Sequence, residues 1–282
     1  MGGLYRIGPA PRIAVEARGQ GPLVVLLHGI GANRHMWRHQ LDALAEDFTV
    51  AAWDARGYLD SDDYEGALRF EAFAEDLERV LDGFGCERAH LIGASMGGRI
   101  AIDFYARQPQ RVASLVLADT SAGSPVQASP ERIEEFLALR RKPLLEGKSP
   151  ADIAPSLART LVSANCPANV FEEAVTILSS LRPSSYLKTL ETVTRFNSFP
   201  RFESVKAPTL VIVGEHDRIA TPEYARQMAD RIPGARFRIL SGVGHLSNME
   251  NPTAFNEAVL EFLAPLAALA SRPSSAPPDA RS

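Results

Sequence analysis

This sequence has few cysteines, no excess of positive charge and no cluster of metal ligands, and each of these features excludes a class of protein. The 282 residues contain two cysteines, Cys86 and Cys166, too few for a disulfide framework or a zinc site, so we expect both to be structural. His35 and His39 stand four apart but have no third ligand, so no metal and no cofactor are expected. A net charge of −4 provides no basic field for nucleic acid or an anionic membrane, and we expect neither as a partner.

The apolar runs near the N-terminus are too short for a membrane span or a secretory signal. The longest aliphatic run there is Leu23–Leu27, whereas a spanning helix needs about 20 apolar residues. Residues 1–15 carry prolines and arginines in place of a continuous apolar segment. We therefore expect a cytoplasmic protein with a small molecule as its partner, and a hydrophobic content of 45% can fill one large core.

Short apolar runs alternate with longer amphipathic segments, which is typical of a parallel sheet crossed by helices. The runs are rich in leucine and β-branched residues, as in strands that are buried on both faces. Strands are expected at Leu23–Leu27, Thr49–Trp53, Ala89–Ile92, Ser114–Ala118, Thr209–Val213 and Arg236–Leu240. Helices are expected at Met36–Ala45, Phe70–Phe84, Ser95–Arg107, Pro222–Arg231 and Pro252–Leu263. The predicted fold class is α/β, with a mostly parallel, doubly wound sheet.

The alternation breaks between residues 121 and 200, where four helical segments follow one another without a strand. These segments are Pro130–Leu145, Pro150–Val162, Val170–Leu181 and Tyr186–Thr194. An insertion after the carboxyl end of a strand would cover the crevice where open α/β sheets bind ligands. We predict a core domain of residues 1–120 and 201–265 and a helical cap of residues 121–200. Residues 266–282 are predicted to form a disordered tail, because Ala, Ser, Pro and Arg dominate them.

A glycine-rich segment, Gly93–Gly98, has the strongest chemical pattern in the chain. It reads Gly-Ala-Ser-Met-Gly-Gly between a predicted strand and a predicted helix, which is the G-x-S-x-G nucleophile elbow in its required context. Glycines flank the serine because the strained turn needs close backbone packing. The helix N-terminus then offers free N–H groups to a developing oxyanion. Ser95 is the expected nucleophile.

A serine hydroxyl needs a base within hydrogen-bond reach, and the base needs a carboxylate that holds its tautomer. Of six histidines, His245 stands in a glycine-rich loop after the last predicted strand, and the chain order Ser, Asp, His fits the elbow. Asp217 follows a predicted strand in the sequence Gly-Glu-His-Asp and is the favoured acid. Asp119, at the end of the strand Ser114–Ala118, is the alternative acid, and its other expected role is to cap the loop leading into the insertion.

Two backbone N–H groups are expected to bind the oxyanion of a tetrahedral intermediate. One belongs to Met96, which follows the expected nucleophile. The other belongs to Ile30 in the sequence His-Gly-Ile-Gly, directly after the first predicted strand. Gly29 in the same loop, and Trp37 shortly after it, are the expected substrate contacts.

The motifs HGIG, WDARG, GASMGG, GEHD and GVGH together resemble those of the α/β-hydrolase superfamily over Leu23–Leu263. Within it the chain looks most like 3-oxoadipate enol-lactonases and carboxylesterase-type serine hydrolases, on the segments Met36-Trp37, Ser95–Gly98 and His245–Glu250. The resemblance implies the α/β-hydrolase fold and cleavage of a small ester or (enol-)lactone through an acyl-serine intermediate. Related enzymes suggest carbon-carbon bond hydrolysis of ring-cleavage products as an alternative. A non-catalytic ligand-binding member of the fold is the other alternative.

Leu59 departs from the family pattern, since members usually have glycine at this position. If its φ is positive, leucine costs about 1 kcal/mol or more relative to glycine. We therefore expect an altered loop beside the pocket, with an effect on substrate choice. The cap is also expected to influence that choice, through apolar residues that face either the pocket or the cap's own core. The candidates are Phe136, Leu137, Leu144, Phe171, Leu181 and Tyr186.

Overall fold

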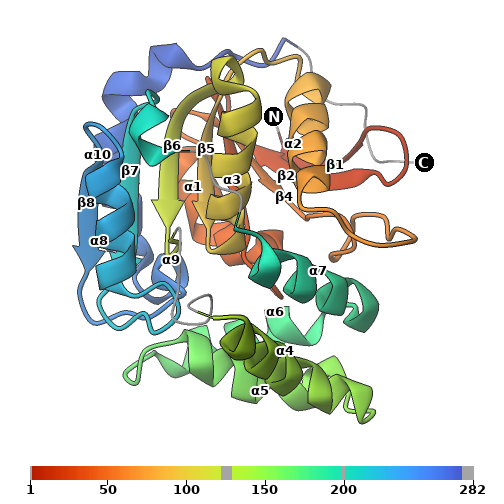
Figure 1. Ribbon diagram of the computed structural model, residues 1–282. Coiled ribbons are helices and arrows are strands. Elements are labelled where there is room, and N and C mark those ends of the chain that lie inside the picture. The colour runs from red at the N-terminus through yellow and green to blue at the C-terminus, as the bar shows by residue number, and fades with distance from the viewer. Residues whose placement is uncertain (1, 122–128, 198–200, 275–282) are drawn as a thin grey trace.

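The computed structural model describes residues 2–121, 129–197 and 201–274 of the chain. Its centre is an eight-stranded sheet in the order β1-β2-β4-β3-β5-β6-β7-β8 (Figure 1). Only the pairs β1–β2 and β2–β4 are antiparallel among these neighbours. The strands are β1 (Gly2–Ile7), β2 (Ile13–Arg18), β3 (Leu23–Leu27), β4 (Thr49–Trp53), β5 (Ala89–Ala94), β6 (Val112–Ala118), β7 (Thr209–Gly214) and β8 (Arg236–Leu240). The predicted α/β class is confirmed.

All six predicted strands are present, and the described part of the sheet has two more at its N-terminal edge. The hairpin of β1 and β2 was not predicted, because β1 begins with two glycines and fully buries only Tyr5 and Ile7. The expectation that every strand is buried on both faces is wrong for β8. Arg236 and Arg238 are exposed there, since β8 pairs with β7 alone at the other edge of the sheet.

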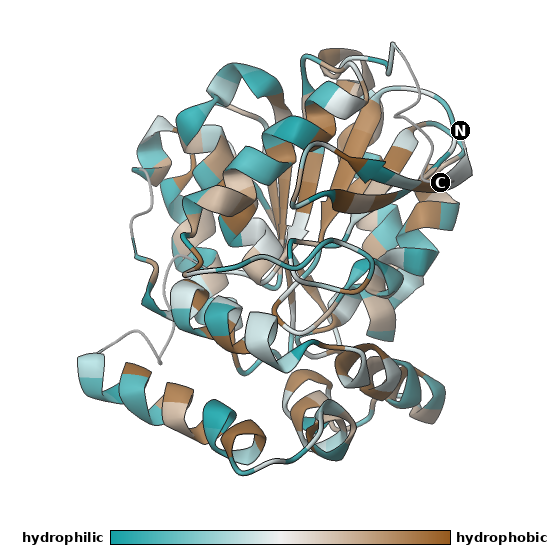
Figure 2. Ribbon diagram, turned by 90° about the vertical axis from the view of Figure 1, so that its right-hand side faces the viewer, coloured by the Kyte–Doolittle hydropathy of each residue, from teal (hydrophilic) through white to brown (hydrophobic). Residues whose placement is uncertain are grey.

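Helices cover both faces of the sheet, and side-chain alternation along the strands produces two apolar clusters. In β3, for example, Leu23, Val25 and Leu27 join one cluster, while Val24 and Leu26 join the other. Figure 2 shows the apolar strands enclosed by helices whose outer faces are hydrophilic. Packed on the first face are α2 (Glu71–Gly83), α3 (Met96–Arg107) and α8 (Pro222–Arg231), and on the second α1 (Arg38–Leu44) and α10 (Pro252–Leu263). Short helical turns are η1 (Arg34–Trp37), η2 (Pro109–Arg111), η4 (Phe202–Ser204), α9 (Ser247–Glu250) and η5 (Ala264–Leu269).

Four helices between β6 and β7 lie together beneath the carboxyl ends of the parallel strands (Figure 1). They are α4 (Pro130–Leu145), α5 (Pro150–Leu161), α6 (Ala168–Ser179) and α7 (Pro183–Arg195), and we call them the helical insertion. Proline in the first turn starts three of the four, and Ser149 forms a capping box with Asp152 at the start of α5. A small apolar cluster inside the insertion contains Leu137, Leu181 and Tyr186.

The helical insertion is tied to the loop that contains Leu59. This residue has a φ of 36°, which meets the condition under which leucine is less favourable than glycine. Arg182 at the start of α7 donates to the carbonyl oxygens of Leu59 (2.6 Å) and Ser61 (2.9 Å). The strained loop therefore faces the insertion rather than a pocket.

The C-terminal segment differs from its prediction. Residues 266–274 were expected to be disordered, but Ser271 donates its N–H to the Arg88 carbonyl (2.8 Å) and accepts from the Leu23 N–H (3.0 Å). Ser274 donates to the carbonyl of Phe84 (3.2 Å). These backbone bonds offset part of the entropy cost that composition alone suggested. The rest of the predicted tail, 275–282, lies outside the described residues.

Across the described ranges, no helix is both long enough and apolar enough to cross a membrane.

Candidate active site

Ser95 lies in a tight turn between β5 and α3, with φ 53° and ψ −113°. Its N–H donates to the Ala118 carbonyl (2.9 Å), and its carbonyl accepts from the Thr120 hydroxyl (2.8 Å). The turn needs glycine nearby: a Cβ on Gly93 would lie 2.3 Å from Gly97, and one on Gly97 would lie 2.0 Å from the Leu27 carbonyl oxygen. Backbone packs directly on backbone here, which forces the serine side chain outward.

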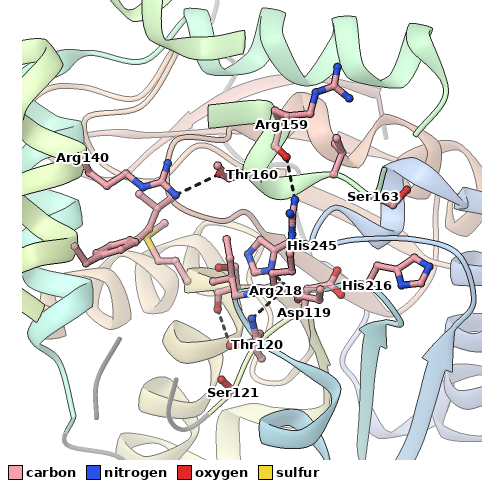
Figure 3. A pocket seen from close by; sticks show the side chains of 18 of the residues that line it. Asp119, Thr120, Ser121, Arg140, Arg159, Thr160, Ser163, His216, Arg218 and His245 are labelled. Carbon is pink, nitrogen blue, oxygen red and sulfur yellow. Dashed lines mark hydrogen bonds and ion pairs between the residues drawn. The ribbon is translucent and has the colours of Figure 1, made fainter. Parts of the chain in front are cut away.

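His245 and Asp217 form a buried pair, with 2.7 Å between Nδ1 and Oδ2. The other carboxylate oxygen of Asp217 accepts the N–H groups of Ile219 (2.7 Å) and Ala220 (3.0 Å), which fixes its orientation. Nδ1 therefore carries a proton, so Nε2 of the neutral ring can accept one. His245 lines the same cavity as Ser95 (Figure 3).

The pKa of His245 is raised above its ordinary value. Burial by itself lowers this pKa, but the charge and hydrogen bond of Asp217 outweigh burial, and Asp119 and Glu250 add to the effect. Asp217 responds in the opposite sense: burial raises its pKa, yet the imidazole and the two backbone N–H bonds leave it below the usual range. The pair is thus arranged to stabilise a protonated imidazole beside an ionised carboxylate.

Asp119 occupies the end of β6 with a φ of 46° but does not bond to the histidine. Its two oxygens accept the Gly214 N–H (2.9 Å), the Ser247 N–H (3.2 Å) and the Ser247 hydroxyl (2.6 Å). Burial and the nearby charge of Asp217 raise the pKa of Asp119 to about 7. Most of the loop that Asp119 was expected to cap, residues 122–128, lies outside the described residues, so that role stays a prediction. Asp119 joins Gly214 at the end of β7, shortly before Asp217, to Ser247 at the start of α9, shortly after His245.

The loop after β3 approaches the serine closely. A Cβ on Gly29 would lie 3.3 Å from the Ser95 Cβ, and Ile30 lines the cavity beside it. His28 holds the loop, since Nδ1 donates to the Gly29 carbonyl (2.8 Å) and Nε2 accepts from the Ala55 N–H (3.0 Å). Burial lowers the pKa of His28 to about 4, so the ring is neutral. Across the turn, the Met96 N–H is the first of α3 and has no acceptor within the helix.

Of the two expected substrate contacts, only Gly29 lies at a pocket. Trp37 is fully buried and packs against Phe255 with ring centroids 6.1 Å apart, outside the lining of either pocket. The prediction for Trp37 is therefore wrong, because a position just after a functional loop does not reveal which way a side chain turns.

A cavity of about 1120 Å³ separates the strand ends from the helical insertion. Polar groups that line it include Thr120, Arg140, Arg159 and Arg218 (Figure 3). An adjoining apolar pocket of about 110 Å³ also reaches Ser95 and His245. The cap candidates Phe136 and Tyr186 are among its lining residues. The arginines were not predicted from the sequence, because no local motif marks a side chain that reaches the site only through tertiary packing.

The insertion also contacts the loop of His245 directly. The His245 N–H donates to the Leu161 carbonyl at the end of α5 (2.7 Å). Glu250 accepts the N–H groups of Gly244 (2.9 Å) and Ser163 (3.0 Å) and so bridges the two segments. A Cβ on Gly244 would lie 2.7 Å from the Ser163 nitrogen, so glycine is needed for this contact.

No group of three or more His, Cys, Asp or Glu side chains within residues 2–121, 129–197 and 201–274 could hold a metal ion. The Nε2 of His39 accepts a hydrogen bond from Arg38 (3.2 Å). The thiols of Cys86 and Cys166 are both free, and burial raises the pKa of each to about 11.

Residues 22–252 match a family model described as alpha/beta hydrolase fold. A curated relative, the 2-hydroxy-6-oxononadienedioate/2-hydroxy-6-oxononatrienedioate hydrolase of Klebsiella pneumoniae, is 32% identical over 271 residues, covering 91% of this chain and 92% of the relative. A thermophilic esterase from Thermogutta terrifontis has a TM-score of 0.82 at 29% identity, over 94% of this chain and 98% of the esterase. The enol-lactonase from Burkholderia xenovorans LB400 has a TM-score of 0.81 at 27% identity, over 90% of this chain and 96% of the lactonase.

The carboxylate of Asp217 beside His245 should raise the pKa that is measured for this imidazole. We expect an NMR titration to give this imidazole a pKa above 6.5, the ordinary value, because Asp217 outweighs burial. In Asp217→Asn the charge is lost, and the pKa is expected to fall by about one unit or more. Equal pKa values in the two proteins would contradict the assigned pairing.

Replacing Glu250 tests the bridge between the insertion and the loop of His245. In Glu250→Gln one of the two backbone N–H groups faces an amide donor instead of an acceptor. We expect the free energy of unfolding, measured with urea, to fall by about 1–3 kcal/mol. Glu223→Gln on the exposed surface of α8 is the matched control. If Glu250→Gln lowers the free energy of unfolding no more than this control, the Glu250 bridge does not stabilise the fold.

Proposed function

Because this chain belongs to the alpha/beta hydrolase fold family and is a hydrolase, we propose that Ser95, His245 and Asp217 form its catalytic triad. The observation that carries the proposal is geometric. Ser95 stands in a positive-φ turn and lines a cavity with His245, and Asp217 holds Nδ1 of that histidine at 2.7 Å. This arrangement matches the nucleophile, base and orienting acid that acyl transfer requires.

In the proposed reaction, Ser95 attacks the carbonyl carbon while Nε2 of His245 takes the hydroxyl proton. The N–H groups of Ile30 and Met96 stabilise the oxyanion. His245 then gives its proton to the leaving group, and an acyl-serine forms. Water, deprotonated by the same histidine, releases the acid and restores the serine.

The substrate that we propose is a small ester or (enol-)lactone. An esterase and an enol-lactonase among the structural neighbours support this choice. We further propose that residues 121–200 act as a cap that shapes the substrate site on a core of residues 1–120 and 201–265. In support, α4, α5 and α7 all contribute residues to the lining of the two pockets. Residues 122–128 and 198–200, at the junctions, lie outside the described residues.

A second candidate function is carbon-carbon bond hydrolysis. The observation that favours it is the identity of 32% to a hydrolase named for dienedioate substrates. The same serine, base and oxyanion donors could act on a ketone. A comparison of kcat/KM on short esters, enol-lactones, larger lactones and ring-cleavage dienoates separates the two candidates.

Removal of the serine hydroxyl tests the triad most directly. Ser95→Ala should lower kcat on 4-nitrophenyl butyrate by about a millionfold, because the covalent route is lost. Its far-UV circular dichroism should match that of wild type. A variant that keeps a tenth of the activity would rule out Ser95 as nucleophile.

The two aspartates should differ in their effect on turnover. Asp217→Asn should lower kcat by about 10⁴-fold, since the imidazole then adopts the wrong tautomer. Asp119→Asn should cost far less, about 10-fold, because Asp119 meets Gly214 and Ser247 rather than the imidazole. Side-by-side steady-state kinetics decide the matter, and a larger loss in Asp119→Asn would move the acid to the end of β6.

A further inference from the structure

Three arginines that line the cavity have no carboxylate partner among the described residues. Arg140, Arg159 and Arg218 line it, and none of these three forms an ion pair within the described part of the chain. The carboxylates of the lining are already engaged. Asp217 bonds to the imidazole, Asp119 accepts three hydrogen bonds, and Glu215 accepts from Ser241 and Gly242 at the exposed rim.

Some half-buried arginines of this protein have carboxylate partners, whereas Arg88 and Arg182 donate to backbone carbonyls. Arg56 bonds to Asp76 with both Nε and Nη2, at 2.6 and 2.8 Å. Arg107 bonds to Asp103 in the same two-pronged way, at 2.8 and 3.2 Å. Placing a guanidinium in a partly enclosed site without an anion costs desolvation energy. The lining therefore has the charge of a site that is completed by an anion.

Arg140 is the best placed of the three arginines. It is half-buried on α4 and lines both the large cavity and the adjoining apolar pocket, each of which also includes Ser95 and His245. By contrast, Arg159 is exposed and stacks on the Phe171 ring at 4.1 Å, and Arg218 is exposed and donates to the Arg159 carbonyl (3.1 Å). Figure 3 shows Arg140 reaching across the cavity from α4 to Thr160 on α5.

The neighbours of Arg140 hold its guanidinium in place without neutralising it. One nitrogen, Nη2, donates to the Thr160 hydroxyl (3.3 Å), and that hydroxyl donates in turn to the Leu157 carbonyl (2.7 Å). The guanidinium lies 5.4 Å from the centroid of the Phe136 ring. A guanidinium has five N–H donors in a planar fork that fits a carboxylate through two parallel hydrogen bonds. Most of these donors remain for a ligand.

We propose that Arg140 is a specificity-determining residue that binds a carboxylate of the substrate. The inference rests on the proposed function, in which Ser95 attacks a separate ester or lactone carbonyl. The substrate class is then an ester or lactone that carries a free carboxylate in addition to its reacting carbonyl. Arg140 anchors this carboxylate at the helical insertion, and the carbonyl reaches the oxyanion donors at the strand ends.

Matched neutral and anionic substrates test the proposal. 4-Nitrophenyl valerate and 4-nitrophenyl hemiglutarate differ by a carboxylate on the acyl part, and phenyl acetate and 4-acetoxybenzoate differ by one on the leaving group. In Arg140→Gln, kcat/KM should fall on the order of 10- to 100-fold for the anionic member of at least one pair, mainly through KM. The neutral members should change by less than about 3-fold, as expected when only a charge-assisted hydrogen bond is lost.

Lys142→Gln is the matched control, because it removes one positive charge from the same helix at an exposed position. It should change no substrate by more than about 3-fold, since exposed charges are screened. Arg140→Lys should recover part of the activity on the anionic ester by keeping the charge without the fork. Equal effects of Arg140→Gln on both members of both pairs would overturn the proposal.

A binding measurement separates failure of this inference from failure of the proposed function. Calorimetry with glutarate should detect binding to Ser95→Ala and at least 10-fold weaker binding to the Ser95→Ala, Arg140→Gln double variant. Equal affinity of the two variants for glutarate would refute the carboxylate site. Full esterase activity in Ser95→Ala would instead refute the triad and leave the binding result to stand.

Discussion

The contact of backbone against backbone at the start of α3 determines where the reacting groups lie. Gly93 and Gly97 have no side chains because the first turn of the helix rests on the ends of β5 and β3. The residue between them, Ser95, is thereby driven to positive φ and out of the sheet. The loop after β3 also lies against this turn, since Gly29 approaches the Ser95 Cβ. One steric constraint thus places the proposed nucleophile and both proposed oxyanion donors.

Charges of opposite sign lie on the two sides of His245, the proposed base. Behind the imidazole of His245, Asp217, Asp119 and Glu250 all favour the protonated ring. In front of it, the cavity is lined by Arg140, Arg159 and Arg218, which form no ion pair with a described carboxylate. In the proposed reaction, Arg140 would attract a carboxylate of the substrate while the proton on His245 is stabilised from behind. The two proposed tasks would use different elements, the strand-end loops for the proton and the helical insertion for the ligand.

How much the sequence could predict depended on how local each feature is. The elbow at Ser95 and the loops of Asp217 and His245 are complete within a few residues, so their motifs were readable without tertiary contacts. Trp37 was wrongly predicted to contact the substrate, because its side chain packs against Phe255, a residue far along the chain. Arg140 was not predicted for the same reason, since its proposed role depends on the position of α4 opposite the strand ends. The β1–β2 hairpin was not recognised because β1 begins with two glycines and buries few side chains.

The hydrogen bond from the His245 N–H to the Leu161 carbonyl couples the helical insertion to the proposed base. A helical cover that swings open as a rigid lid would break this bond and the Glu250 bridge, and so disturb the proposed base each time a molecule entered. In a chimera with the helical insertion of another protein, Leu161–Ser163 should be kept from the host, because these residues contact the loop of His245, the proposed base.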